Sequence, residues 1–134
     1  MSAEVPAGFQ PSGRTGPFFD MIGPVYTSTG GRGILLGLRA RTEHCNARGF
    51  VHAAVLAALL DVVCGRNCGA RTPSNPNLLT VSLTVDYIAA AQDGDWLEAS
   101  ATVARAGRRL AFADGKVEVA GKTVAKASAI FAVG

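Results

Sequence analysis

The chain has 134 residues, 49% of them hydrophobic, and thirteen Lys and Arg against ten Asp and Glu give a net charge of +3. A chain of this length holds one domain with one core, and its mean hydropathy of +0.25 argues against a disordered protein. The weak positive charge fits an anionic small molecule but is too small to predict nucleic-acid binding.

Neither a membrane span nor a secretory signal is predicted from the sequence. No apolar run reaches the ~20 residues that cross a bilayer, and the chain does not start with a basic segment followed by an apolar block. We therefore expect a cytoplasmic protein that binds no membrane. Cys45, Cys64 and Cys68 are an odd number of cysteines at spacings that fit no common zinc motif, so we expect reduced thiols and no metal.

The first third of the chain predicts a tail, a short helix and a hairpin. Residues 1–16 are rich in Gly and Pro and predict a flexible N-terminal tail. The apolar cluster in 17–23 predicts one or two helical turns. Strands are expected at 25–28 and 34–41, joined by a glycine-rich turn.

A polar loop over 42–49 then leads into an apolar segment that predicts a buried helix from about Phe50 to Gly69. Between Phe50 and Cys64, the strongly polar residues are His52, near the helix start, and Asp61, near its far end. A carboxylate is costly to bury without a partner, so Asp61 either faces solvent, pairs with Arg66 or Arg71, or has a chemical role.

After a loop at 71–77, the hydrophobic period changes from helical to alternating, which predicts strands. In the first, 79–87, the alternation places Leu79 with the apolar face and Thr80 with the polar face. Further strands are predicted at 97–103, 109–119 and 123–133. The pattern indicates an α+β fold in which an antiparallel sheet covers one helix.

The stretch 44–61 resembles a motif of the 4-hydroxybenzoyl-CoA thioesterase superfamily, in the PaaI-like branch of hotdog-fold acyl-CoA thioesterases. That motif has the form H-x-N-x-x-G-x-x-H-G-G followed by an apolar helix holding an acid. The matching positions are His44, Asn46, Gly49, His52 and Asp61, while Ala53-Ala54 replaces the usual Gly-Gly. The resemblance implies a hotdog domain over 17–134, with a curved antiparallel sheet wrapped around one long central helix.

The resemblance also implies the chemistry of an acyl-CoA thioesterase that needs no cofactor beyond the CoA of its substrate. Asp61 would act as nucleophile or as general base, and the backbone N–H of Ala53 would polarise the thioester carbonyl. Asn46 would hydrogen-bond at the thioester, and His52 would brace the helix start. Thr80 would have a catalytic or positioning role.

Substrate binding is predicted to involve Gly49 in the loop and a basic group in the C-terminal half of the chain. Arg105, Arg108 and Arg109 are candidates for holding the CoA phosphates, because Arg is a common phosphate partner. A solvated charged face is an equally good interpretation of any one of them.

The spacing of Ala53 and Asp61 predicts a site shared between two chains. Eight residues along an α-helix span ~12 Å and ~80° of rotation, so one small carbonyl cannot touch both on one helix. A symmetric dimer supplies a second helix running the other way, and the resemblance extends this to a dimer of dimers. Two other functions stay open: a non-catalytic acyl-CoA-binding protein, and a dehydratase or hydratase acting on acyl thioesters.

Overall fold

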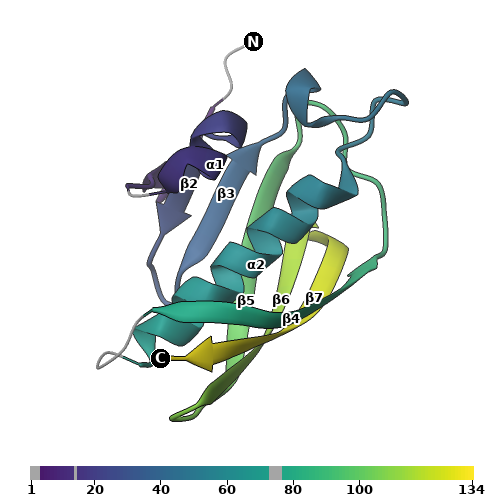
Figure 1. Ribbon diagram of the computed structural model, residues 1–134. Coiled ribbons are helices and arrows are strands. Elements are labelled where there is room, and N and C mark those ends of the chain that lie inside the picture. Colours follow the sequence, from purple (N-terminus) through teal and green to yellow (C-terminus); the bar gives the residue numbers. More distant parts are fainter. Residues whose placement is uncertain (1–3, 14, 73–76) are drawn as a thin grey trace.

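The computed structural model describes residues 4–13, 15–72 and 77–134. Within these ranges the chain forms a seven-stranded antiparallel sheet, two α-helices and one 3₁₀ turn (Figure 1). The helices are α1 (Gly16–Ile22) and α2 (Ala53–Ala70), and the 3₁₀ turn is η1 (Thr42–His44). The strands are β1 (Gln10–Pro11), β2 (Val25–Ser28), β3 (Leu35–Arg39), β4 (Leu78–Tyr87), β5 (Trp96–Ala106), β6 (Leu110–Val119) and β7 (Lys122–Val133).

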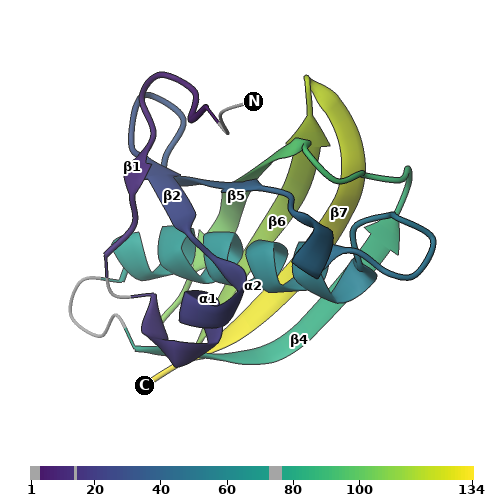
Figure 2. The same cartoon turned by 90° about the horizontal axis from the view of Figure 1, so that it is seen from above.

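The sheet curves around α2, and β4 is its outer strand on one side (Figure 2). The strand order is β1-β2-β3-β5-β6-β7-β4, so the strand that follows α2 pairs with the last strand of the chain. The other edge of β4 has no strand partner among the described residues. Leu79 and Val81 on β4 are 73% and 58% exposed, so this edge is open and apolar.

The core lies between α2 and the concave face of the sheet. By length and composition α2 is apolar enough to cross a membrane, but here one side of it is buried against the strands. Gly115 on β6 permits this close packing, because a Cβ at that position would lie 2.8 Å from the Sγ of Cys64. The buried side of α2 consists of Val55, Leu56, Leu59, Leu60, Val63, Cys64, Asn67 and Cys68.

The predicted helices and strands are confirmed, with differences at the N-terminal end and at the start of α2. Gln10 and Pro11, which fall in the predicted tail, form β1 against β2, and the ring of Phe9 packs 5.2 Å from that of Trp96. The long helix begins at Ala53 rather than at Phe50, because Phe50 is held in an isolated bridge to Gln92. The predicted loop at 71–77 lies mostly outside the described residues.

A β-bulge in β4 overturns the simple alternation predicted for this strand. Thr80 pairs with Phe131 and Ser82 pairs with Ile130, so Val81 is the extra residue. The extra residue reverses which side chains face the helix. Thr80 on one side of the bulge and Leu83 on the other therefore both point toward α2, although their sequence spacing predicts opposite faces.

Candidate functional site

His44 is buried and fixes the loop before α2. Its Nδ1 accepts a hydrogen bond from the backbone N–H of Arg41 at 2.9 Å, and its Nε2 lies 2.6 Å from the carbonyl oxygen of Ile22. One ring nitrogen therefore accepts and the other donates, which is the pattern of a neutral imidazole. Through these bonds the end of α1 is tied to the loop.

Asn46 shapes the next turn with one end of its side chain. Its Oδ1 accepts hydrogen bonds from the backbone N–H groups of Arg48 and Phe50, at 2.9 and 3.2 Å. Gly49 completes the turn at φ +86°, a conformation that favours glycine. The Nδ2 of Asn46 has no hydrogen-bond partner in the described part of the chain, and the residue is exposed. Two donor hydrogens of Asn46 therefore remain available to a ligand.

His52 is the N-cap of α2. Its Nδ1 accepts a hydrogen bond from the N–H of Ala54 at 3.1 Å, and its carbonyl oxygen accepts one from Val55 at 3.0 Å. The resemblance implies a bracing role for His52 at the helix start, which is where this cap lies. The N–H of Ala53, by contrast, has no partner within 4–13, 15–72 and 77–134, and Ala53 is exposed. It is a helix-start donor with partial positive charge that is open to a ligand.

Asp61 and Thr80 form a hydrogen-bonded pair two turns further along α2. The hydroxyl of Thr80 donates to Oδ1 of Asp61 at 2.6 Å, and the bulge at Val81 is what turns Thr80 toward the helix. Asp61 is half-buried and makes no ion pair with a described residue. Arg66 instead donates to the hydroxyls of Ser12 and Thr27, at 2.9 and 3.4 Å. A carboxylate held by a neutral hydroxyl keeps one oxygen available for chemistry.

The predicted catalytic residues therefore fall into two groups within one chain. Asn46, His52 and Ala53 lie at the start of α2, whereas Asp61 and Thr80 lie ~12 Å further along the helix axis. Within one chain, the N–H of Ala53 and the carboxylate of Asp61 are therefore too far apart to contact the same substrate carbonyl group.

The three predicted phosphate-binding arginines lie at the tip of the β5–β6 hairpin. Arg105, Arg108 and Arg109 are all exposed, and none makes an ion pair within the described residues. The N–H of Val133 donates to the carbonyl oxygen of Arg109 at 2.9 Å. Since Leu78 pairs with Val133, this hairpin tip lies at the end of the sheet where β4 begins, near Thr80.

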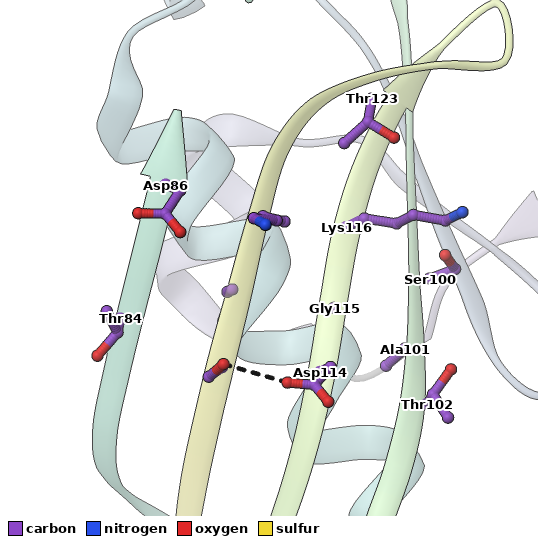
Figure 3. Close-up of a pocket in the computed structure, with 12 residues that line it drawn as sticks. Thr84, Asp86, Ser100, Ala101, Thr102, Asp114, Gly115, Lys116 and Thr123 are labelled. Atoms are coloured by element: carbon purple, nitrogen blue, oxygen red, sulfur yellow. Dashed lines mark hydrogen bonds between the residues drawn. The ribbon is translucent and has the colours of Figure 1, made fainter. Parts of the chain in front are cut away.

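A groove of about 530 Å³ on the outer face of the sheet was not predicted from the sequence (Figure 3). It lies on the side away from α2 and contains none of the predicted catalytic residues. Strand pairing places one row of charged side chains across the groove: Asp86, Lys126 and Lys116. In the neighbouring row, the hydroxyl of Ser128 donates to Asp114 at 3.1 Å. Charges of both signs and short hydroxyl side chains make it a polar surface.

Cys64 and Cys68, on the buried side of α2, are not activated nucleophiles. Burial raises the pKa of the Cys64 thiol to about 12, and burial also raises the pKa of Cys68. Both thiols face the core and stay protonated at neutral pH. Both residues are free cysteines packed in the core.

Comparison with known proteins gives matches over most of the chain. Residues 48–126 match the family model of the thioesterase superfamily. A candidate esterase of Pseudomonas aeruginosa is 37% identical over 129 residues, which cover 95% of this chain and 96% of the relative.

Two solved structures share the architecture. A variant of the phenylacetic acid degradation protein PaaI from Thermus thermophilus superposes with a TM-score of 0.77 at 23% identity, covering 87% of this chain and 98% of that one. A Bacillus halodurans protein in a structure with CoA superposes with a TM-score of 0.69 at 26% identity, covering 74% of this chain and 66% of that one.

Proposed function

This chain belongs to the thioesterase superfamily as a PaaI-like, hotdog-fold thioester hydrolase, and we propose that it hydrolyses acyl-CoA thioesters to a free acid and CoA. The observation that carries the proposal is the hydrogen bond from Thr80 on β4 to Asp61, which is the one charged residue in the apolar first two-thirds of α2, residues 53–64. A carboxylate in such a position is suited to acyl transfer, because few water molecules compete with it for the thioester.

Asp61 acts on the thioester carbonyl in one of two ways. As a general base it takes a proton from water while the water oxygen adds to the carbonyl carbon. As a nucleophile its own oxygen adds, giving an acyl–aspartate anhydride that water then hydrolyses. In both, the carbonyl oxygen becomes an oxyanion, and the C–S bond breaks as CoA leaves as a thiolate that then takes up a proton.

The free N–H of Ala53 is the proposed donor to that oxyanion. A preorganised backbone donor aimed at developing negative charge is worth ~10²–10³ in rate. Ala in place of the usual Gly keeps this N–H and adds only a methyl group. The Nδ2 of Asn46, which bonds none of the described residues, supplies a second donor at the same end of the helix.

The two groups of residues would meet in a homodimer, and we propose that each active site is shared. Two antiparallel copies of α2 across a two-fold axis place Asn46 and Ala53 of one chain opposite Asp61 of the other. The open apolar edge of β4, with Leu79 and Val81 exposed, supports this arrangement, because a second chain would cover it.

The basic hairpin tip is the proposed binding site for the phosphates of CoA. Arg105, Arg108 and Arg109 have no acidic partner in the part of the chain that the structure describes, and they lie at the Thr80 end of the sheet. The structure of the Bacillus halodurans protein with CoA supports an acyl-CoA ligand. Gly49, which allows the turn that presents Asn46, has an indirect part in binding.

Thiol release from a panel of aliphatic and aromatic acyl-CoAs tests this function. We expect turnover of at least one panel member and a loss of at least ~10²-fold in Asp61→Asn, because an amide neither attacks nor accepts a proton at neutral pH. Binding of the same acyl-CoA, followed by calorimetry, should survive the substitution. Binding without turnover in the wild type would favour the non-catalytic function, and a variant keeping more than about a tenth of the rate would remove Asp61 from the mechanism.

A further inference from the structure

Tyr87 is the last residue of β4 and contacts the start of α2. Its hydroxyl donates a hydrogen bond to the carbonyl oxygen of Ala53 at 3.1 Å. Ala53 is the first residue of the helix and carries the free N–H described above. The proposed mechanism gives Tyr87 no part, and neither the motif nor the predicted site includes it.

The backbone around Tyr87 is firmly held. The N–H groups of Ile88 and Ala89 both donate to the carbonyl oxygen of Val124, at 2.8 and 3.2 Å. The following segment also supports the residue before His52, since the N–H of Val51 donates to Ala91 at 2.8 Å. The tyrosine hydroxyl therefore projects from a fixed strand end onto the first turn of α2, where helices fray most readily.

We propose that Tyr87 is a positioning residue that holds the first turn of α2 so that the N–H of Ala53 points at the thioester oxygen. This inference rests on the proposed function, in which that N–H stabilises the oxyanion. A hydrogen bond to the carbonyl oxygen of Ala53 restricts motion of the first helical turn. This matters because an oxyanion donor stabilises the transition state only if its orientation is fixed before the reaction.

Strand β4 then supports both groups of catalytic residues in each chain. Thr80 near its start holds Asp61, and Tyr87 at its end holds Ala53. In a shared-site dimer these two groups serve different active sites. A lesion at Tyr87 should therefore damage only the site to which its own chain contributes Ala53, and leave the other site intact.

Tyr87→Phe removes the hydroxyl and keeps the ring. We expect kcat to fall about tenfold, equivalent to ~1.4 kcal/mol on the barrier, with KM little changed, because the donor is misdirected mainly in the transition state. Amide hydrogen exchange should become faster at residues 54–56 and stay unchanged in the middle of α2. Tyr26→Phe is the matched control: Tyr26 packs 5.8 Å from the Trp96 ring and its hydroxyl bonds no described residue.

Subunit mixing separates positioning from a general structural effect. Mixed with inactive Asp61→Asn, Tyr87→Phe should form heterodimers with one wholly intact site. Activity should rise from about a twentieth to about a quarter of wild type. Asn46→Ala damages the same group of residues at the start of α2 that Tyr87 is proposed to position. A mixture of Tyr87→Phe with Asn46→Ala should therefore show no rise in activity.

Full kcat in Tyr87→Phe, or unchanged exchange at the helix start, would overturn the inference. A rise with Asn46→Ala rather than with Asp61→Asn would overturn it too. Mixing Asn46→Ala with Asp61→Asn reports on the proposed function by itself. If that pair shows no recovery the shared site is wrong, while kcat and exchange still decide whether Tyr87 positions the helix start.

Discussion

Thr80 is placed to orient the carboxylate of Asp61, and its contribution can be measured without removing the acid. Thr80→Val keeps the shape of the side chain and deletes the hydroxyl that donates to Asp61. We expect kcat to fall about tenfold, less than in Asp61→Asn, because the carboxylate stays but loses its preferred orientation. The measurement is thiol release from the best acyl-CoA under steady-state conditions.

The same strand offers a matched control for this substitution. Thr84 is exposed and lines the groove on the outer face of the sheet, away from α2. Thr84→Val makes the same chemical change at a comparable strand position and should leave kcat unchanged. Equal losses in the two variants would mean that the effect arises from the strand and not from Asp61.

The burial of Cys64 makes the free energy of unfolding decrease at high pH. Burial raises its pKa from 9.0 to about 12, so folding favours the neutral thiol. The resulting stability is fully present below pH 9 and declines as the pH rises from 9 toward 12. The decline has a slope of up to ~1.4 kcal/mol per pH unit.

Cys64→Ala removes the titrating thiol and should flatten this decline. Urea unfolding between pH 7 and pH 10.5 measures the free energy of unfolding for each variant. Val63→Ala, a truncation at the neighbouring buried position on α2, should lower the free energy of unfolding at every pH but keep the wild-type slope. Identical slopes for Cys64→Ala and the wild type would contradict a buried neutral thiol.

At the scale of elements, Gly37 in β3 makes room for the ring of Trp96 in β5. A Cβ on Gly37 would overlap this ring, so no side chain fits there without a shift of the indole. We expect Gly37→Ala to lower the free energy of unfolding by ~1–3 kcal/mol, the usual cost of overpacking a core. Gly30→Ala, where a Cβ would meet nothing within 4 Å, should be close to neutral by the same urea assay.

The elements themselves were predictable from hydrophobic period, but two local departures that build the site were not. Alternation correctly indicates a strand at 79–87, yet it assigns Thr80 to the face opposite Leu83. The bulge at Val81 arises from pairing with β7, some fifty residues away, so no local pattern reveals it. The resemblance nevertheless selected Thr80 as a catalytic or positioning residue.

The start of α2 also depends on pairing with distant residues, which the local sequence pattern does not reveal. An apolar run from Phe50 predicts helix, whereas pairing of Phe50 with Gln92 delays the helix to Ala53. That delay makes His52 the N-cap and leaves the N–H of Ala53 without a partner in the described residues. The contact from Tyr87 was also invisible, because nothing in the sequence relates the end of one strand to the first turn of a helix.

At the scale of the whole molecule, the curved sheet wrapped around one helix follows the predicted fold, and the thioesterase superfamily is the predicted one. The proposed association of two chains rests on helix geometry. One straight helix cannot bring Ala53 and Asp61 to a single carbonyl, and the open edge of β4 leaves a surface for a second chain. The shared active site is therefore the central claim about function.

Restoration of activity in mixed dimers tests that claim most directly. Asn46→Ala and Asp61→Asn, each inactive alone, are mixed in equal amounts under conditions where subunit exchange is verified by mass-tagged chains. A heterodimer then has one site with both lesions and one site with neither, so activity should return to about a quarter of wild type. A mixture that exchanges fully and stays inactive would contradict the shared site.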